Sequence, residues 1–185
     1  MTPYKRSETS IRVLVVNHSG IIREGLCLML ERFTGIEVVA SIGHLHGLGE
    51  IARQERVDVA LIDALLPGEA CFDVHRRLQE GGATTRVVIL SVSRGVGDVR
   101  RALESGASGF LLQDAGAAEL EIALHAAATG QTFLCPTIIK QLGLGLSPKH
   151  VSTRTTLDVG PSQGPDQIEA IIDSALRQGI LREGA

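Results

Sequence analysis

Aromatic residues and cysteines are both scarce in this chain. It contains no tryptophan, and aromatic residues make up only 3% of it, which leaves little to stack against a flavin ring. The three cysteines, Cys27, Cys71 and Cys135, lie far apart and are odd in number, whereas zinc sites and redox pairs need close spacing and disulfide frameworks need an even number. We therefore expect no flavin, zinc or disulfide framework, and cysteines that serve as buried apolar residues in a reducing compartment.

Long apolar runs and an excess of one charge are also missing. No segment reaches the roughly 18 apolar residues that a membrane-spanning helix requires, and the polar amino-terminal residues are not followed by the apolar h-region of a signal peptide. The formal net charge is −3 over 185 residues, so the composition does not indicate a nucleic-acid surface. We expect a cytoplasmic protein that has no membrane partner.

Five apolar segments of β type alternate with helical patterns, in a chain long enough for one packed domain and an appendage. Their near-continuous Val, Ile and Leu content is typical of strands covered on both faces of a parallel sheet. This alternation predicts an α/β fold with a doubly wound, five-stranded parallel sheet. The predicted strands are 11–16, 37–40, 57–62, 86–91 and 109–112, and the apolar helical faces are formed by Ile22, Leu26, Met29, Leu30 and Phe33, by Val99, Ala102 and Leu103, and by Leu120, Ala123, Leu124 and Ala127.

Polar side chains stand at or just after the ends of four predicted strands. They are Asn17 and His18, Asp63, Ser91 and Gln113. In a doubly wound sheet the carboxyl ends of the strands meet at one edge, where ligands and reaction centres lie. One acid, one hydroxyl, one imidazole and two amides suit small-anion or partner recognition better than a magnesium site, which usually needs several carboxylate or phosphate oxygens. The alternative is that these groups only cap the strand ends.

Several collinear motifs resemble the receiver domains of NarL/FixJ-type two-component response regulators. The resemblance covers about residues 11–142, and motifs that agree in order and spacing are far more specific than one short pattern. The matching segments are 12–26 (RVLVVNHSGIIREGL), 57–63 (VDVALID) with Pro67 and Gly68 after it, 86–91 (RVVILS) and 102–115 (ALESGASGFLLQDA). This resemblance implies a flavodoxin-like (CheY-like) sheet with the strand order 2-1-3-4-5.

The resemblance also implies a phosphorylation chemistry from which this chain departs. In such receivers an acid pair and the phosphoacceptor hold magnesium, a lysine pairs with the phosphoryl group, and a hydroxyl reports it. Here Asp63 and Ser91 match the phosphoacceptor and the switch hydroxyl, but Asn17 and His18 occupy the acid-pair positions and Gln113 the lysine position. Because phosphoryl transfer depends on electrostatic stabilisation, we expect weak or absent magnesium binding and inefficient phosphorylation.

His18 is the most unusual of these residues, and two interpretations of it stay open. A protonated imidazole beside Asp63 would form an internal ion pair that mimics a fixed charge state. The alternative is a histidine that simply faces solvent.

Three hypotheses explain a receiver whose pocket lacks these charges. In the first hypothesis, the domain is a constitutive interaction module, which forms a homodimer or binds another transcription regulator through the helical faces around its fourth and fifth strands. Alternatively, it binds a small-molecule ligand in the pocket of Asn17, His18, Ser91 and Gln113. In the third hypothesis, Asp63 accepts phosphate slowly. We rank them in this order.

The residues after 142 only partly match the helix-turn-helix domain that follows NarL/FixJ receivers. Residues 146–149 (LSPK) resemble its start and 160–162 (GPS) its central turn, but 150–159 has too few apolar positions for the scaffold helix. Residues 165–179 predict one amphipathic helix instead. From residue 143 onward the chain has four Lys and Arg against five Asp and Glu, so we expect contacts with protein, and direct DNA binding is the lesser alternative.

The sequence thus predicts a four-part organisation and a non-enzymatic role. The parts are a disordered leader (1–10), a receiver domain (11–131), a linker helix with a flexible segment (132–164) and a carboxyl-terminal helix (165–185). No Ser-His-Asp arrangement, Gly-rich phosphate loop or metal-ligand cluster is present in the sequence. We expect a regulator, acting in signal transduction and transcription regulation.

Overall fold

The computed structural model describes residues 10–66 and 73–141. Pro67, Gly68 and Cys71 therefore lie outside the described residues, as do the leader up to residue 9 and the predicted carboxyl-terminal helix. Strands and helices alternate through the described part of the chain. They are β1 (Ile11–Val16), α1 (Gly20–Leu30), β2 (Ile36–Ile42), α2 (Leu48–Gln54), β3 (Val59–Asp63), α3 (Val74–Glu80), β4 (Arg86–Ser91), α4 (Val96–Glu104), β5 (Gly109–Leu112), α5 (Ala117–Ala128), β6 (Phe133–Leu134) and α6 (Pro136–Gln141).

The strands form one parallel sheet with the order β2-β1-β3-β4-β5-β6. The prediction of a doubly wound parallel sheet with the order 2-1-3-4-5 is confirmed for the first five strands. The sixth strand was not predicted, because its two residues are too few to show a periodicity. β3 begins later than predicted and ends on Asp63, which pairs with Leu90 of β4.

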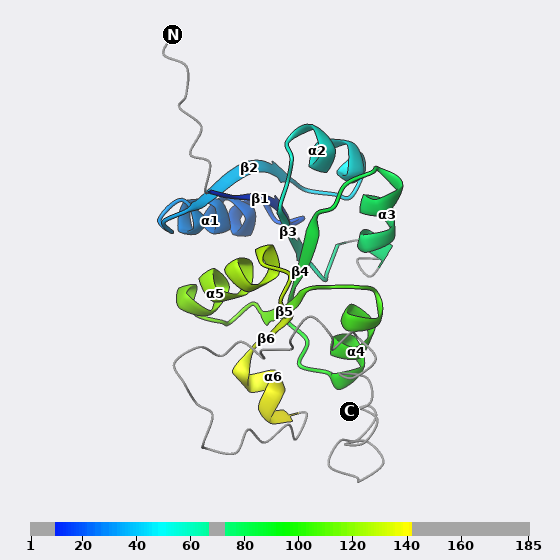
Figure 1. Ribbon diagram of the computed structural model, residues 1–185. Helices are drawn as coiled ribbons and strands as arrows, with labels where there is room; N and C mark the ends of the chain where they lie inside the picture. The colour runs from blue at the N-terminus through cyan, green and yellow to red at the C-terminus, as the bar shows by residue number, and fades with distance from the viewer. Residues whose placement is uncertain (1–9, 67–72, 142–185) are drawn as a thin grey trace.

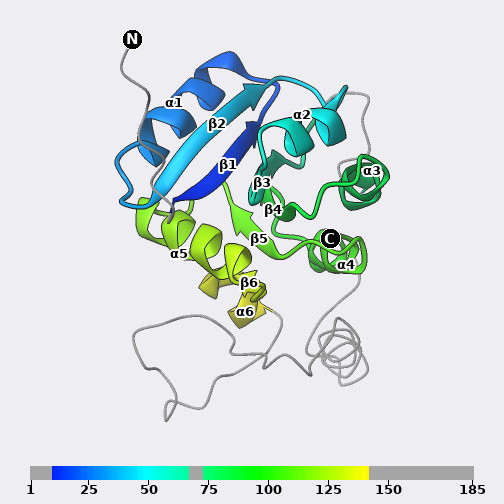
Figure 2. The same ribbon diagram turned by 45° about the horizontal axis from the view of Figure 1, so that its top comes forward.

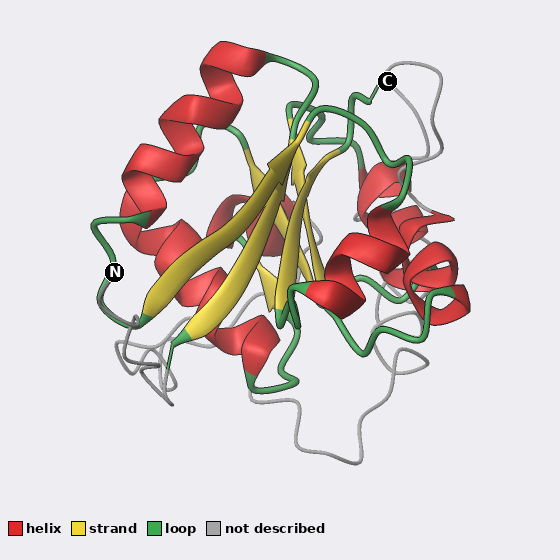
Figure 3. Ribbon diagram, turned by 90° about the horizontal axis from the view of Figure 1, so that it is seen from above, coloured by secondary structure: helices red, strands yellow, loops and turns green. Residues whose placement is uncertain are grey.

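Helices cover both faces of the sheet, α1 and α5 on one side and α2, α3 and α4 on the other (Figures 1, 2 and 3). All residues of β3 and β5 are buried, and so are most of those in β1 and β4. This double cover explains the near-continuous apolar sequence of these strands. Strand β2 forms one edge of the sheet and is mostly half-buried.

The predicted apolar faces of α4 and α5 are buried, but that of α1 is only partly so. Leu30 is fully buried, and Leu26 and Phe33 pack partly against the core, whereas Ile22 and Met29 are 41% and 37% exposed. The prediction was wrong for these two residues because α1 carries apolar side chains around most of its circumference. Its spacing alone could not indicate the buried side.

The cysteine prediction is confirmed for Cys135, which is 1% exposed in the core. Burial raises the pKa of its thiol, as expected for an unreactive apolar side chain. Cys27 is half-buried in α1. Within the described residues, no helix has the length and apolar content needed to cross a membrane.

Candidate functional site

The predicted site residues converge at the carboxyl edge of the sheet. Asp63 and Ser91 end β3 and β4, Asn17 and His18 follow β1, and Gln113 follows β5. Asn17, Asp63 and Ser91 are buried at 0%, 1% and 2% exposure. The parallel topology therefore brings these five side chains to one edge, as the strand-end argument predicts.

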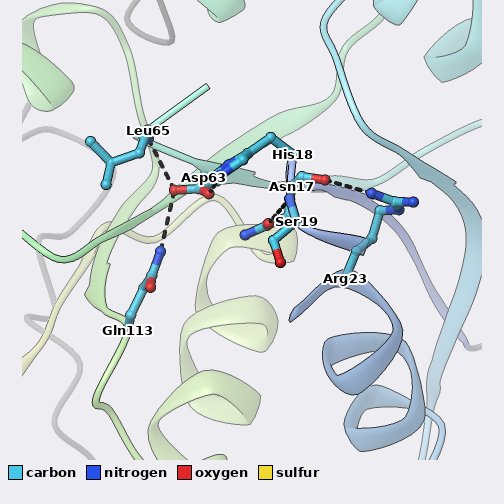
Figure 4. Close-up of polar contacts among 7 residues, drawn as sticks. All are labelled: Asn17, His18, Ser19, Arg23, Asp63, Leu65 and Gln113. Carbon is cyan, nitrogen blue, oxygen red and sulfur yellow. Dashed lines mark hydrogen bonds and ion pairs between the residues drawn. The ribbon is translucent and has the colours of Figure 1, made fainter. Parts of the chain in front are cut away.

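The Asp63 carboxylate is at the centre of a hydrogen-bonded network (Figure 4). Its Oδ1 accepts hydrogen bonds from the backbone N–H of Leu65 at 3.0 Å and from the Gln113 side-chain amide at 3.2 Å. Its Oδ2 lies 3.2 Å from Nδ1 of His18. A buried carboxylate is costly unless it is paired and hydrogen-bonded, and these three groups supply its partners.

The His18 side chain combines the two arrangements that the sequence left open. It contacts Asp63 through Nδ1, yet it is 43% exposed to solvent. Protonation of the imidazole would make this contact an ion pair. The geometry thus permits an internal counter-ion for Asp63 at the edge of the site.

The side-chain amide of Asn17 has its oxygen hydrogen-bonded, while its nitrogen has no partner within the part of the chain that the structure describes. Its Oδ1 accepts a hydrogen bond from the backbone N–H of Ser19 at 2.9 Å, which fixes the orientation of the amide. Its Nδ2 is buried and has no hydrogen-bond partner among the described residues. Buried polar groups are nearly always paired, so this nitrogen is available to a water molecule or another small acceptor.

Hydrogen bonds and an ion pair connect the residues that follow β4 with those that follow β5. The backbone N–H of Gln113 donates to the carbonyl of Ser91 at 2.9 Å, and the Ser91 hydroxyl oxygen accepts from the backbone N–H of Ser93 at 3.0 Å. An ion pair between Arg94 and Asp114 links the same two loops at the surface. The loop after β4 is thereby tied to the Ser91 hydroxyl and to the residue after Gln113.

Arg23 was not recognised as a site residue from the sequence. Its guanidinium donates to the carbonyl of Asn17 at 2.8 Å and so holds the loop between β1 and α1 (Figure 4). Arg23 lies on the same side of α1 as Cys27 and Leu30, which packs inward, but the spacing of α1 could not indicate this side from the sequence. A cation at such a position usually has a specific partner.

The donor set of the network does not fit magnesium. Mg²⁺ prefers octahedral oxygen coordination, usually by carboxylates or phosphates together with water. In this network Asp63 is the one carboxylate, and both of its oxygens are already engaged by His18, Gln113 and Leu65. The Asn17 amide oxygen is likewise engaged by Ser19.

Comparison with known proteins identifies the family. Residues 13–125 match the response regulator receiver domain, and the chain belongs to this family. Response regulator GacA of Pseudomonas viridiflava is 32% identical over 134 residues, which are 72% of this chain and 63% of GacA. The nitrate/nitrite response regulator NarP of Escherichia coli K12 is 31% identical over 157 residues, which are 82% of this chain and 73% of NarP. The chain thus spans a little under two thirds of GacA.

Solved structures agree with this assignment. The signal receiver domain of the response regulator NarL from Mycobacterium tuberculosis is 30% identical, with a TM-score of 0.62, over 66% of this chain and 98% of that domain. A LuxR-family two-component response regulator from Aurantimonas sp. SI85-9A1 is 27% identical, with a TM-score of 0.66, over 71% and 94%. The predicted resemblance to NarL/FixJ-type receivers is confirmed, and the chain contains a response regulator receiver domain of two-component signalling.

Proposed function

We propose that this chain is an atypical response regulator that acts in transcription regulation through protein-protein contacts, largely independently of phosphorylation, and that it has no enzymatic activity. The observation that carries this proposal is the contact set of Asp63, the phosphoacceptor position by resemblance. His18, Gln113 and the Leu65 N–H hold its carboxylate where other receivers have an acid pair and a lysine.

The electrostatics of these contacts support the proposal. Replacing two acids by Asn17 and His18 removes most of the negative charge that would hold a divalent cation. Gln113 donates a hydrogen bond but carries no charge, so it cannot act as a counter-ion to a phosphoryl group. The changes are mutually consistent, because a buried lysine beside fewer acids would lack its partners.

Incubation with acetyl phosphate and Mg²⁺, followed by intact-mass measurement, tests the proposal. We expect no phosphoryl mass on the wild type, as on an Asp63→Asn variant, while a conventional receiver domain in the same buffer gains it. Loss of the cation site removes interactions that are each worth on the order of a hundredfold in rate. A phosphoryl group on the wild type that Asp63→Asn lacks would instead establish a conventional switch with a variant pocket.

A second candidate function is the binding of a small molecule at the same place. It is supported by the buried Asn17 Nδ2, which has no hydrogen-bond partner among the described residues, near the polar groups of Asp63 and Gln113 (Figure 4). Native mass spectrometry of the purified chain would then show a stoichiometric adduct that an Asn17→Ala variant loses. A wild-type spectrum without any adduct contradicts this candidate.

A further inference from the structure

Two histidines lie in the short connection between β2 and α2 (Figure 1). His44 and His46 are both exposed, whereas Leu45 between them is 2% exposed and belongs to the core. The centres of the two imidazole rings are 6.3 Å apart, and the ring planes meet at 62°. The connection thus presents two neighbouring imidazoles at the surface of the domain.

The spacing of the two histidines in the sequence does not indicate that they meet. Residues i and i+2 of a helix point to different faces, so this spacing argues against a shared site if the helix includes them. In the structure α2 begins only at Leu48, and the side chains of residues 44–46 alternate between solvent and core. Alternation with a period of two directs residues i and i+2 to the same side of the backbone, which explains why the two rings lie together.

The ring nitrogens of both histidines are available to an external partner. His18 contacts Asp63 in the structure, and His75 contacts Gln79. By contrast, within the described part of the chain the side chains of His44 and His46 make no hydrogen bond or ion pair, and contact each other. Neutral imidazole is the commonest protein ligand of metal ions, so two neighbouring imidazoles without other partners suit a metal ion.

The backbone that carries the two rings is held in place on both sides. Before them, the carbonyl of Ile42 accepts a hydrogen bond from the backbone N–H of Asn17 at 3.1 Å. After His44, the Leu45 side chain is buried and the Leu45 carbonyl accepts from the backbone N–H of Leu48 at 3.2 Å. Because the backbone is already fixed, only side-chain rotation has to be restricted on binding, and this lowers the entropic cost of holding an ion.

We propose that His44 and His46 together bind a divalent transition metal ion that prefers imidazole, such as Cu²⁺ or Zn²⁺. An ion at about 2.0–2.1 Å from one nitrogen of each ring would place the ring centres roughly 5–6 Å apart, which rotation of two exposed side chains can reach. Among the described residues, no group of three or more His, Cys, Asp and Glu side chains could hold a metal ion, so water would fill the remaining positions. The site is separate from the Asp63 network and does not depend on the proposed function.

Calorimetric titration of the full chain with Cu²⁺ tests the proposal. We expect saturable binding that His44→Ala and His46→Ala each weaken by at least roughly tenfold in Kd, because the loss of a group that merely supports a metal ligand already costs on the order of 10–100-fold in metal affinity. The matched control is His125→Ala, which makes the same change at an exposed histidine in α5 and should leave the Kd unchanged. Excess Mg²⁺ should not displace Cu²⁺, since Mg²⁺ prefers oxygen ligands.

Two further measurements separate metal binding from folding. Without metal, His44→Ala and His46→Ala should melt at the wild-type temperature, because both side chains are exposed. Electron paramagnetic resonance of the copper-loaded wild type should show two nitrogen ligands, and fewer in each single variant. A wild type that binds no Cu²⁺ overturns the proposal, and so does an affinity that either variant leaves unchanged, because a shared site needs both rings. A copper spectrum without two nitrogen ligands in the wild type would also overturn it.

Discussion

The triple variant Asn17→Asp, His18→Asp and Gln113→Lys is expected to accept a phosphoryl group on Asp63 in a magnesium-dependent reaction, at a rate at least about a hundredfold above that of the wild type. Removing one preorganised group that stabilises a transition state costs on the order of a hundredfold or more. The variant would restore a cation site and a positively charged side chain together. Each is needed for phosphoryl transfer, which depends on positioning and charge stabilisation.

The structure indicates why the changes must be made together. The Gln113 side-chain nitrogen already lies 3.2 Å from Asp63 Oδ1, so a lysine at this position can reach the same carboxylate. Alone, it would form an internal pair with Asp63 and compete with magnesium. The two added acids alone would place three carboxylates at one buried edge, where like charges repel. Either partial variant is therefore expected to remain unphosphorylated.

Two measurements check this prediction. After incubation with acetyl phosphate and Mg²⁺, the intact mass of the triple variant should show one phosphoryl group. No phosphoryl group should appear when a chelator removes Mg²⁺, or when the variant also carries Asp63→Asn as a fourth substitution. Thermal unfolding should show that Mg²⁺ stabilises the triple variant and leaves the wild type unchanged, because a cation stabilises only a folded state that binds it. A triple variant that folds, binds no Mg²⁺ and stays unphosphorylated would show that the pocket differs by more than these three residues.

Much of the fold could be predicted from the sequence because the central strands are covered on both faces. Their continuous apolar segments predicted the bounds of β1, β4 and β5 as the structure has them. The apolar faces of α4 and α5 were also predicted correctly from the spacing of their apolar residues. α1 is different, since its apolar residues run around most of its circumference and only packing against β1 and β2 decides which of them are buried.

The candidate site was predictable in its membership but not in its contacts. Parallel strands bring Asn17, Asp63, Ser91 and Gln113 to one edge whatever the side-chain geometry. The contact between His18 and Asp63 depends on the rotamer of one half-exposed ring, which no spacing rule fixes. Arg23 was missed for a related reason, because its partner is a backbone carbonyl and a carbonyl carries no sequence signal.

The Gly81→Ala variant is expected to lower the free energy of unfolding by about 1–2 kcal/mol. A Cβ at Gly81 would lie 2.6 Å from Cα and 2.8 Å from the carbonyl carbon of Gly49 in α2. Both are backbone atoms, so α2 and α3 would have to separate, and Leu48 and Leu78, each 1% exposed, would lose packing. Such overpacking costs about 1–3 kcal/mol.

The sign of the Gly81→Ala effect is decided by this close approach of the two helices. Gly81 has a φ of −76°, which alanine adopts without strain, so the backbone conformation does not oppose the change. Replacing glycine by alanine otherwise stabilises by about 0.4–1 kcal/mol through the unfolded state, and this gain offsets part of the steric loss. Gly97→Ala in α4 is the matched control, because a Cβ there would meet nothing within 4 Å. In urea unfolding, the free energy of unfolding of Gly97→Ala should equal or exceed that of the wild type, and that of Gly81→Ala should be lower. Equal free energies of unfolding for the two variants would contradict the prediction, because α2 and α3 could then move apart without cost.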